Sequence, residues 1–153
     1  MTDVQVKRVY KCDHAVTKTP LVLFHDIKLF LQEVQESDWY RRTWPTSSKL
    51  SVAMGMRTDM ACYWPGQDLI HVPTREEGLI KQRSGDWAWN KEMLCHEIGH
   101  HVGLHDALGA HGKEFAGAYL YLVQHAISQE RADELEALYI KNKVSYAVPK
   151  PVR

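Results

Sequence analysis

The chain has 153 residues, of which 44% are hydrophobic and 25% are charged, and this composition is typical of a folded globular protein. Its 19 Lys and Arg residues balance its 19 Asp and Glu residues, so no overall field directs it to nucleic acid or to a membrane. No apolar run approaches the roughly 20 residues of a membrane span. We therefore expect one domain over residues 1–153, with 1–12 and 144–153 loose at its ends.

The three cysteines are widely spaced and include no Cys-x-x-Cys pair. Free thiols are typical of a reducing compartment, and the first residues lack the basic-then-apolar layout of a secretory signal. We therefore expect a cytoplasmic protein. These features do not predict an oligomeric state.

The first half of the chain predicts one helix. Residues 3–12 indicate an extended or frayed lead-in, and Asp26 can then cap a helix that ends near Ser37 and packs behind a sheet. Its apolar residues, spaced as on one helical face, are Ile27, Phe30, Leu31 and Val34.

Three short apolar stretches then predict a small sheet. They cover residues 50–54, 61–64 and 69–72, with turn residues between the second and the third. Pro73 follows the third stretch and cannot donate to a ladder, which favours an edge position for that strand.

The second half of the chain predicts three helices. Asp86 is a candidate cap for the first, which extends to about Gly103, and Ser128 is a candidate cap for the last. Residues 111–115 open the middle helix. Its apolar face would comprise Phe115, Ala118, Tyr119, Leu122 and Ala126. Helices before and after a small sheet predict an α+β fold.

The sequence His96-Glu97-x-x-His100 lies in the first of these helices. Two histidines four residues apart project from one helical face and can share a metal ion, and a glutamate beside them can deprotonate a metal-bound water. An apolar stripe occupies roughly the opposite face and comprises Trp87, Leu94, Ile98 and Val102. We therefore expect the helix to bury this stripe against the sheet and to turn its histidines toward a cleft.

A catalytic zinc site needs a third protein ligand, and three residues after His100 are candidates. Asp106 fits the metzincin spacing, but no methionine follows the motif to form the methionine turn of that class. His111 suits a histidine-rich zinc site better, and Glu114 is a weaker candidate. We favour His111, with Asp106 as the second choice.

Nearby side chains have weaker interpretations. His101 and His105 repeat the four-residue spacing but point away from the ligand face, which favours supporting or solvated roles over a second metal site. Tyr119 and Tyr121 could donate to an oxyanion, although packing in the core is the default for both.

The motif His96-Glu97-Ile98-Gly99-His100 followed by His111-Gly112-Lys113-Glu114-Phe115 resembles the SprT-like zincins. A closer resemblance is to small zinc metallohydrolases of actinobacteria and their phages, which also share Val9-Tyr10 and the aromatic-Arg-Arg-x-Trp-Pro element at 40–45. The resemblance implies a zincin fold. It also implies a zinc ion held by His96, His100 and His111, with Glu97 as general base.

These observations favour a zinc-dependent hydrolase, most simply a metallopeptidase acting on a peptide or protein substrate. Residues 69–72, as an edge strand, could pair with an extended substrate. One alternative is a non-catalytic binding module stabilised by zinc. Another is a DNA-associated protease, suggested by the SprT-like resemblance and by Arg41, Arg42 and Lys49, although zero net charge disfavours nucleic acid as a partner.

Overall fold

The computed structural model describes residues 4–55, 61–74, 88–103 and 111–152. Asp86, Trp87, His105 and Asp106, which the sequence singled out, lie outside these ranges. Within the described ranges, no helix is both long enough and apolar enough to cross a membrane.

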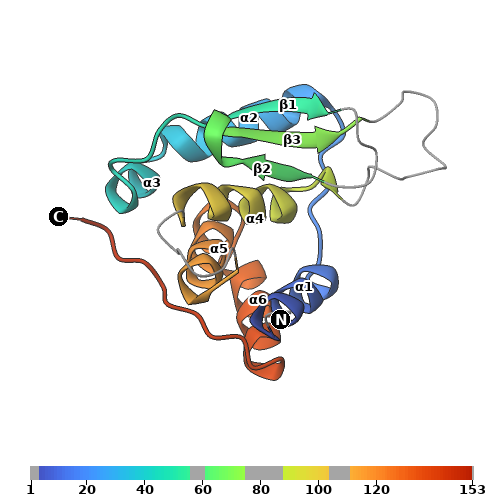
Figure 1. The fold of residues 1–153 in the computed structure, drawn as a ribbon, viewed down its shortest axis with the longest axis vertical. Helices are drawn as coiled ribbons and strands as arrows, with labels where there is room; N and C mark the ends of the chain where they lie inside the picture. The colour runs from blue at the N-terminus through green and yellow to red at the C-terminus, as the bar shows by residue number, and fades with distance from the viewer. Residues whose placement is uncertain (1–3, 56–60, 75–87, 104–110, 153) are drawn as a thin grey trace.

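In the described part of the chain, helices precede and follow a three-stranded sheet, so the α+β prediction is confirmed (Figure 1). The elements in chain order are α1 (Val4–Ala15), α2 (Phe24–Glu36), α3 (Asp38–Thr43), β1 (Ser51–Gly55), β2 (Cys62–Trp64), the 3₁₀ turn η1 (Pro65–Gln67), β3 (Leu69–Pro73), α4 (Lys91–Val102), α5 (Lys113–Ala126) and α6 (Gln129–Lys141).

The sheet has the order β1-β3-β2, with β1 parallel and β2 antiparallel to β3. The prediction that the third strand lies at an edge is therefore wrong, because β3 is the central strand. Pro73 is tolerated there because it is the last residue of β3, paired with Gly55, so its missing N–H affects only the end of the ladder. The short strand β2 is an edge of the sheet instead.

Helix α2 packs against β1, as expected for a helix behind the sheet (Figure 1). Its four predicted apolar residues are all buried, and Ser37 follows its last turn. The helix begins at Phe24, so Asp26 is not the N-cap. Asp26 lies in the first turn, where its Oδ2 accepts a hydrogen bond of 3.0 Å from the Leu23 N–H.

The extended lead-in predicted for residues 3–12 is wrong, because residues 4–15 form the helix α1. Val9, Cys12, Asp13 and Val16 are all buried. Their spacing of i, i+3, i+4 and i+7 is that of one helical face. The face escaped the sequence reading because one of its four members is a carboxylate.

The tail over residues 144–152 forms no helix or strand, but it is not loose. The Ala147 N–H donates to the Lys113 carbonyl at the start of α5 over 2.9 Å. Gly117 makes room for this contact, since a Cβ there would lie 1.7 Å from the Ala147 carbonyl oxygen. The expectation that 144–153 is loose is therefore wrong for this part of the tail.

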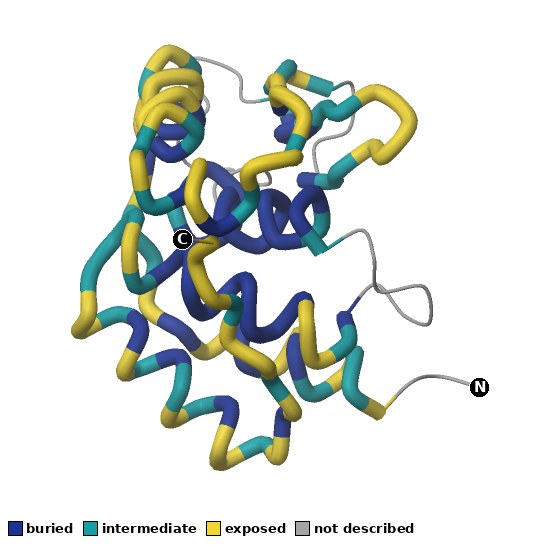
Figure 2. Tube along the Cα trace, turned by 90° about the vertical axis from the view of Figure 1, so that its left-hand side faces the viewer, coloured by how far each residue is buried: buried dark blue, intermediate teal, exposed yellow. Residues whose placement is uncertain are grey.

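Helices α4 and α5 form the middle of the core. Nearly every residue of α4 and most residues of α5 are buried, and the buried segments run through the centre of the molecule (Figure 2). Helix α4 lies beside β2 on one side and packs on α5 on the other. Any side chain in the middle of α4 is thus held by neighbouring elements rather than exposed to solvent.

Candidate metal centre

Helix α4 carries the His96-Glu97-x-x-His100 motif. Its N-cap is Asn90, whose Oδ1 accepts a 2.8 Å hydrogen bond from the Met93 N–H, so the described helix begins later than the cap at Asp86 would place it. His96 and His100 lie one turn apart on it, as the motif predicts.

Glycine within the motif allows α5 to approach α4 closely. A Cβ at Gly99 would lie 3.0 Å from a ring carbon of Phe115, which is tighter than ordinary packing. Phe115 is buried in the first turn of α5, and His111 lies two residues before that helix. The close approach of the two helices thus brings His111 back toward α4.

Three imidazoles converge between α4 and the start of α5. His96 Nε2 lies 3.2 Å from His100 Nε2 and 3.4 Å from His111 Nε2. A tetrahedral zinc ion with Zn–N bonds of about 2.0–2.1 Å needs its ligand nitrogens about 3.3 Å apart. Among the described residues, these three histidines form a group able to hold a metal ion. The donor set and spacing therefore fit zinc.

Phe115 packs behind all three rings. Its ring is stacked on His100, with centroids 4.4 Å apart, and lies edge-on to His96 and His111, both at 4.9 Å. Because Phe115 is almost fully buried, its ring is fixed by the core and limits how the three histidine rings can turn. The aromatic residue four positions after His111 is thus part of the site's support.

Glu97 follows His96 and is almost fully buried. Burial raises the pKa of its carboxyl to about 7, although the charge of His96 and a hydrogen bond from the Tyr63 backbone lower it. Tyr63 is the middle residue of β2. The Glu97 side chain is therefore held at the edge of the sheet, next to the histidines.

A carboxylate that the sequence reasoning missed lies behind His96. The Oδ2 atom of Asp13 in α1 is 2.7 Å from His96 Nδ1, and both side chains are 3% exposed. Among the described residues, no hydrogen bond of regular geometry is made by either Asp13 carboxylate oxygen or by His96 Nδ1, so the 2.7 Å contact is a close approach of these two polar groups to each other. Burial lowers the pKa of His96, but the charge and hydrogen bond of Asp13 and the charge of Glu97 raise it more, so the net shift is upward.

Tyr10 is the second missed residue, and it comes from the same helix. Its ring centroid lies 4.9 Å from that of His111 and 6.2 Å from that of His96. Tyr10 is 44% exposed, so it borders the site on the side toward solvent. Helix α1 therefore contributes one buried group and one exposed group to the cluster.

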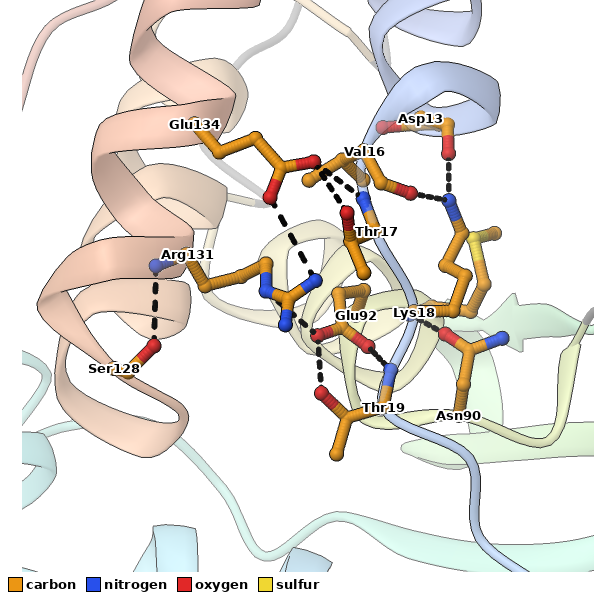
Figure 3. Close-up of polar contacts among 11 residues, drawn as sticks. Asp13, Val16, Thr17, Lys18, Thr19, Asn90, Glu92, Ser128, Arg131 and Glu134 are labelled. Carbon is orange, nitrogen blue, oxygen red and sulfur yellow. Dashed lines mark hydrogen bonds and ion pairs between the residues drawn. The ribbon is translucent and has the colours of Figure 1, made fainter.

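The segment after α1 attaches that helix to α4 and α6 (Figure 3). Thr19 donates its N–H and its hydroxyl to the buried Glu92 carboxylate in the first turn of α4, the latter over 2.8 Å. Thr17 does the same to Glu134 of α6, over 2.6 and 2.8 Å. Arg131 lies between the two carboxylates, 3.8 Å from Glu92 and 3.7 Å from Glu134. This network fixes the end of α1 close to Asp13.

Three other candidates from the sequence are not part of the histidine cluster. His101 is buried and bridges the Tyr63 hydroxyl and the Ser48 carbonyl, at 2.7 and 2.8 Å. Tyr121 bonds its hydroxyl to Thr43, in keeping with the packing role. Glu114 is exposed and is not part of the histidine group.

Tyr119 is fully buried, with its ring 5.6 Å from that of His96. Burial raises the pKa of its hydroxyl well above the usual value. This burial supports packing in the core over a role as a donor to substrate.

Comparison with known proteins gives no further identification: no family model matches the chain, and no curated protein or solved structure is significantly similar to it.

Proposed function

We propose that this protein is a zinc-dependent hydrolase, most simply a metallopeptidase of the SprT-like zincin type. The observation that carries the proposal is the convergence of the three Nε2 atoms of His96, His100 and His111 beside the buried carboxyl of Glu97. A non-catalytic zinc site does not require such a carboxyl. A bound zinc ion would supply Lewis-acid activation of water and of the scissile carbonyl.

Glu97 would act as the general base. In the metal-free protein the pKa of Glu97 is raised to about 7, and a carboxylate with a pKa in this range can take a proton and return it to a leaving amine. The hydrogen bond from the Tyr63 backbone restricts the carboxylate without removing it from the histidines. The proton would be held at a carboxylate oxygen between the two transfers.

The edge strand β2 supports a peptide as the substrate. The Tyr63 backbone contact with Glu97 indicates that the free edge of β2 faces α4. An extended peptide could add to the part of this edge that Glu97 does not occupy, through main-chain hydrogen bonds, and lie across the site. The substrate pairing that the sequence analysis assigned to residues 69–72 thus moves to β2, because β3 is central.

The test compares wild type with Glu97→Gln on a library of fluorogenic peptides and on an unfolded protein. We expect turnover to fall by about 10²–10⁴-fold while one zinc ion still binds, since loss of general-base catalysis has that size. Glu114→Gln is the matched control, because it changes an exposed carboxylate near the site. Undiminished turnover of a wild-type substrate by zinc-loaded Glu97→Gln would refute the mechanism.

A further inference from the structure

We propose that Asp13 is a positioning residue that fixes the proton of His96 on Nδ1 and so presents Nε2 to the metal. This inference rests on the proposed function, because it assigns a role at the same histidine cluster. It adds α1, outside the sequence motif, to the parts of the chain that build the site.

The geometry of the contact determines which nitrogen carries the proton. A carboxylate only accepts hydrogen bonds, so the 2.7 Å contact between Asp13 Oδ2 and His96 Nδ1 requires a proton on Nδ1. In neutral His96, Nε2 is then an acceptor with a free lone pair. That lone pair is directed to the point where His100 Nε2 and His111 Nε2 lie 3.2 and 3.4 Å away. The other tautomer would place a proton at that point.

The burial of Asp13 indicates that the carboxylate is retained for this contact. A buried carboxylate is costly unless it is paired, and in the described part of the chain His96 is the group that faces its oxygens. Lys18 is nearby, but its Nζ bonds the backbone carbonyls of Asp13 and Val16 at the end of α1, not the Asp13 carboxylate. Lys18 thus holds the helix end through these carbonyls, and its charge reaches the Asp13 carboxylate without a hydrogen bond to it.

The surroundings keep Asp13 at this distance. Figure 3 shows Asp13 next to the segment that Thr17 and Thr19 attach to Glu134 and Glu92. Glu92 belongs to the first turn of α4, the helix that carries His96. The same helix is therefore connected to the end of α1 twice, once through this network and once through the Asp13–His96 contact.

The experiment measures zinc affinity by competition with a chromophoric chelator for wild type, Asp13→Asn, Asp13→Ala and Asp13→Glu. We expect Asp13→Asn and Asp13→Ala to weaken binding by about 10–100-fold, as for other residues that support a histidine ligand. Asp13→Glu should retain more affinity than Asp13→Ala because it keeps the carboxylate. Asp133→Asn is the control, since Asp133 is exposed on α6.

A second readout separates positioning from general stability. Long-range ¹⁵N–¹H NMR of the metal-free wild type should find His96 protonated at Nδ1, and Asp13→Ala should shift protonation toward Nε2. Equal zinc affinities, or a wild-type His96 protonated only at Nε2, would overturn the role of Asp13 alone. A wild type that binds no zinc would overturn the proposed function itself, so the two failures are distinguishable.

Discussion

Helices α4 and α1 both bring side chains to the histidine cluster, but only the residues of α4 can be recognised from the sequence alone. On α4 the ligands are four residues apart, so local helical geometry alone brings His96 and His100 together. Asp13 in α1 is 83 positions before His96 in the chain, and its contact depends on how α1 packs. Site residues that share one helix can thus be recognised from their spacing in the sequence, whereas contacts between site residues on different helices can be recognised only from the fold.

His111, just before α5, lies between these two cases, and its removal should have the largest effect. We expect His111→Ala to lower zinc affinity by more than about 100-fold, because it removes one of three nitrogens rather than a supporting group. Chelator competition measures the change. His14→Ala is the control, since His14 is an exposed histidine of α1. A wild-type affinity for His111→Ala would assign the third ligand to another residue, with Asp106 the first to examine.

The buried carboxyl of Glu97 should make the metal-free protein less stable as pH rises. The folded-state pKa of Glu97, about 7, lies above its ordinary value of 4.5, so the folded state binds a proton more tightly than the unfolded state. The resulting stability is fully present below pH 4.5 and is lost as pH rises to about 7. The free energy of unfolding that depends on this proton is about 3 kcal/mol, since each unit of pKa difference corresponds to about 1.36 kcal/mol.

Urea denaturation of metal-free wild type and Glu97→Gln at pH 5 and at pH 8 tests this. Glutamine does not titrate, so the stability of wild type relative to Glu97→Gln should fall between the two pH values. A constant difference would show that Glu97 is not held in a protonation-sensitive environment. Glu114→Gln, at an exposed position, should give no such trend.

The fold was predictable wherever one element buries one apolar face. The face of α2 and the cap of α6 at Ser128 follow from local spacing, and the structure confirms both. Helix α1 was missed because Asp13 interrupts its apolar face, and the face is recognisable only once a buried partner for a carboxylate is allowed. The central position of β3 was not predicted because Pro73 was taken to favour an edge. Its missing N–H affects only one residue of the ladder, not the whole strand.

The same reasoning explains what could be predicted of the site. His96, His100 and His111 were identified from motif and resemblance, and the structure brings them together. Asp13 and Tyr10 were not identified, because no rule of spacing links residues so far apart in the chain. The two residues are three positions apart, and on a helix this spacing places them on the same side. That relation can be used only after α1 is recognised as a helix.

The C-terminal tail allows a test of whether the chain ends are attached. An alanine inside a helix is normally more stable than a glycine by about 1 kcal/mol. At Gly117 the added Cβ would meet the Ala147 carbonyl at 1.7 Å, and such overpacking costs about 1–3 kcal/mol. We therefore expect Gly117→Ala to be destabilising in urea denaturation. An increase in stability would mean that the tail contact contributes little. Gly66→Ala, where nothing lies within 4 Å of the added Cβ, is the control.

The smallest effect should come from the exposed residue of α1. Tyr10→Phe keeps the ring beside His111 and removes only the hydroxyl, so zinc affinity should not change. If this hydroxyl donates to bound substrate, kcat/KM should fall by about two- to twelvefold, because such a hydrogen bond contributes about 0.5–1.5 kcal/mol.

Comparing Tyr10 with Asp13 then tests whether these two residues of α1 have different roles. Asp13 variants should change metal binding, and Tyr10→Phe should change only turnover, because one side chain is buried behind His96 and the other faces solvent. If Tyr10→Phe weakened zinc binding as much as Asp13→Asn, the phenol would be part of the metal support. The distinction between the buried side of α1, which supports the metal ligands, and its exposed side, which does not, would then be wrong.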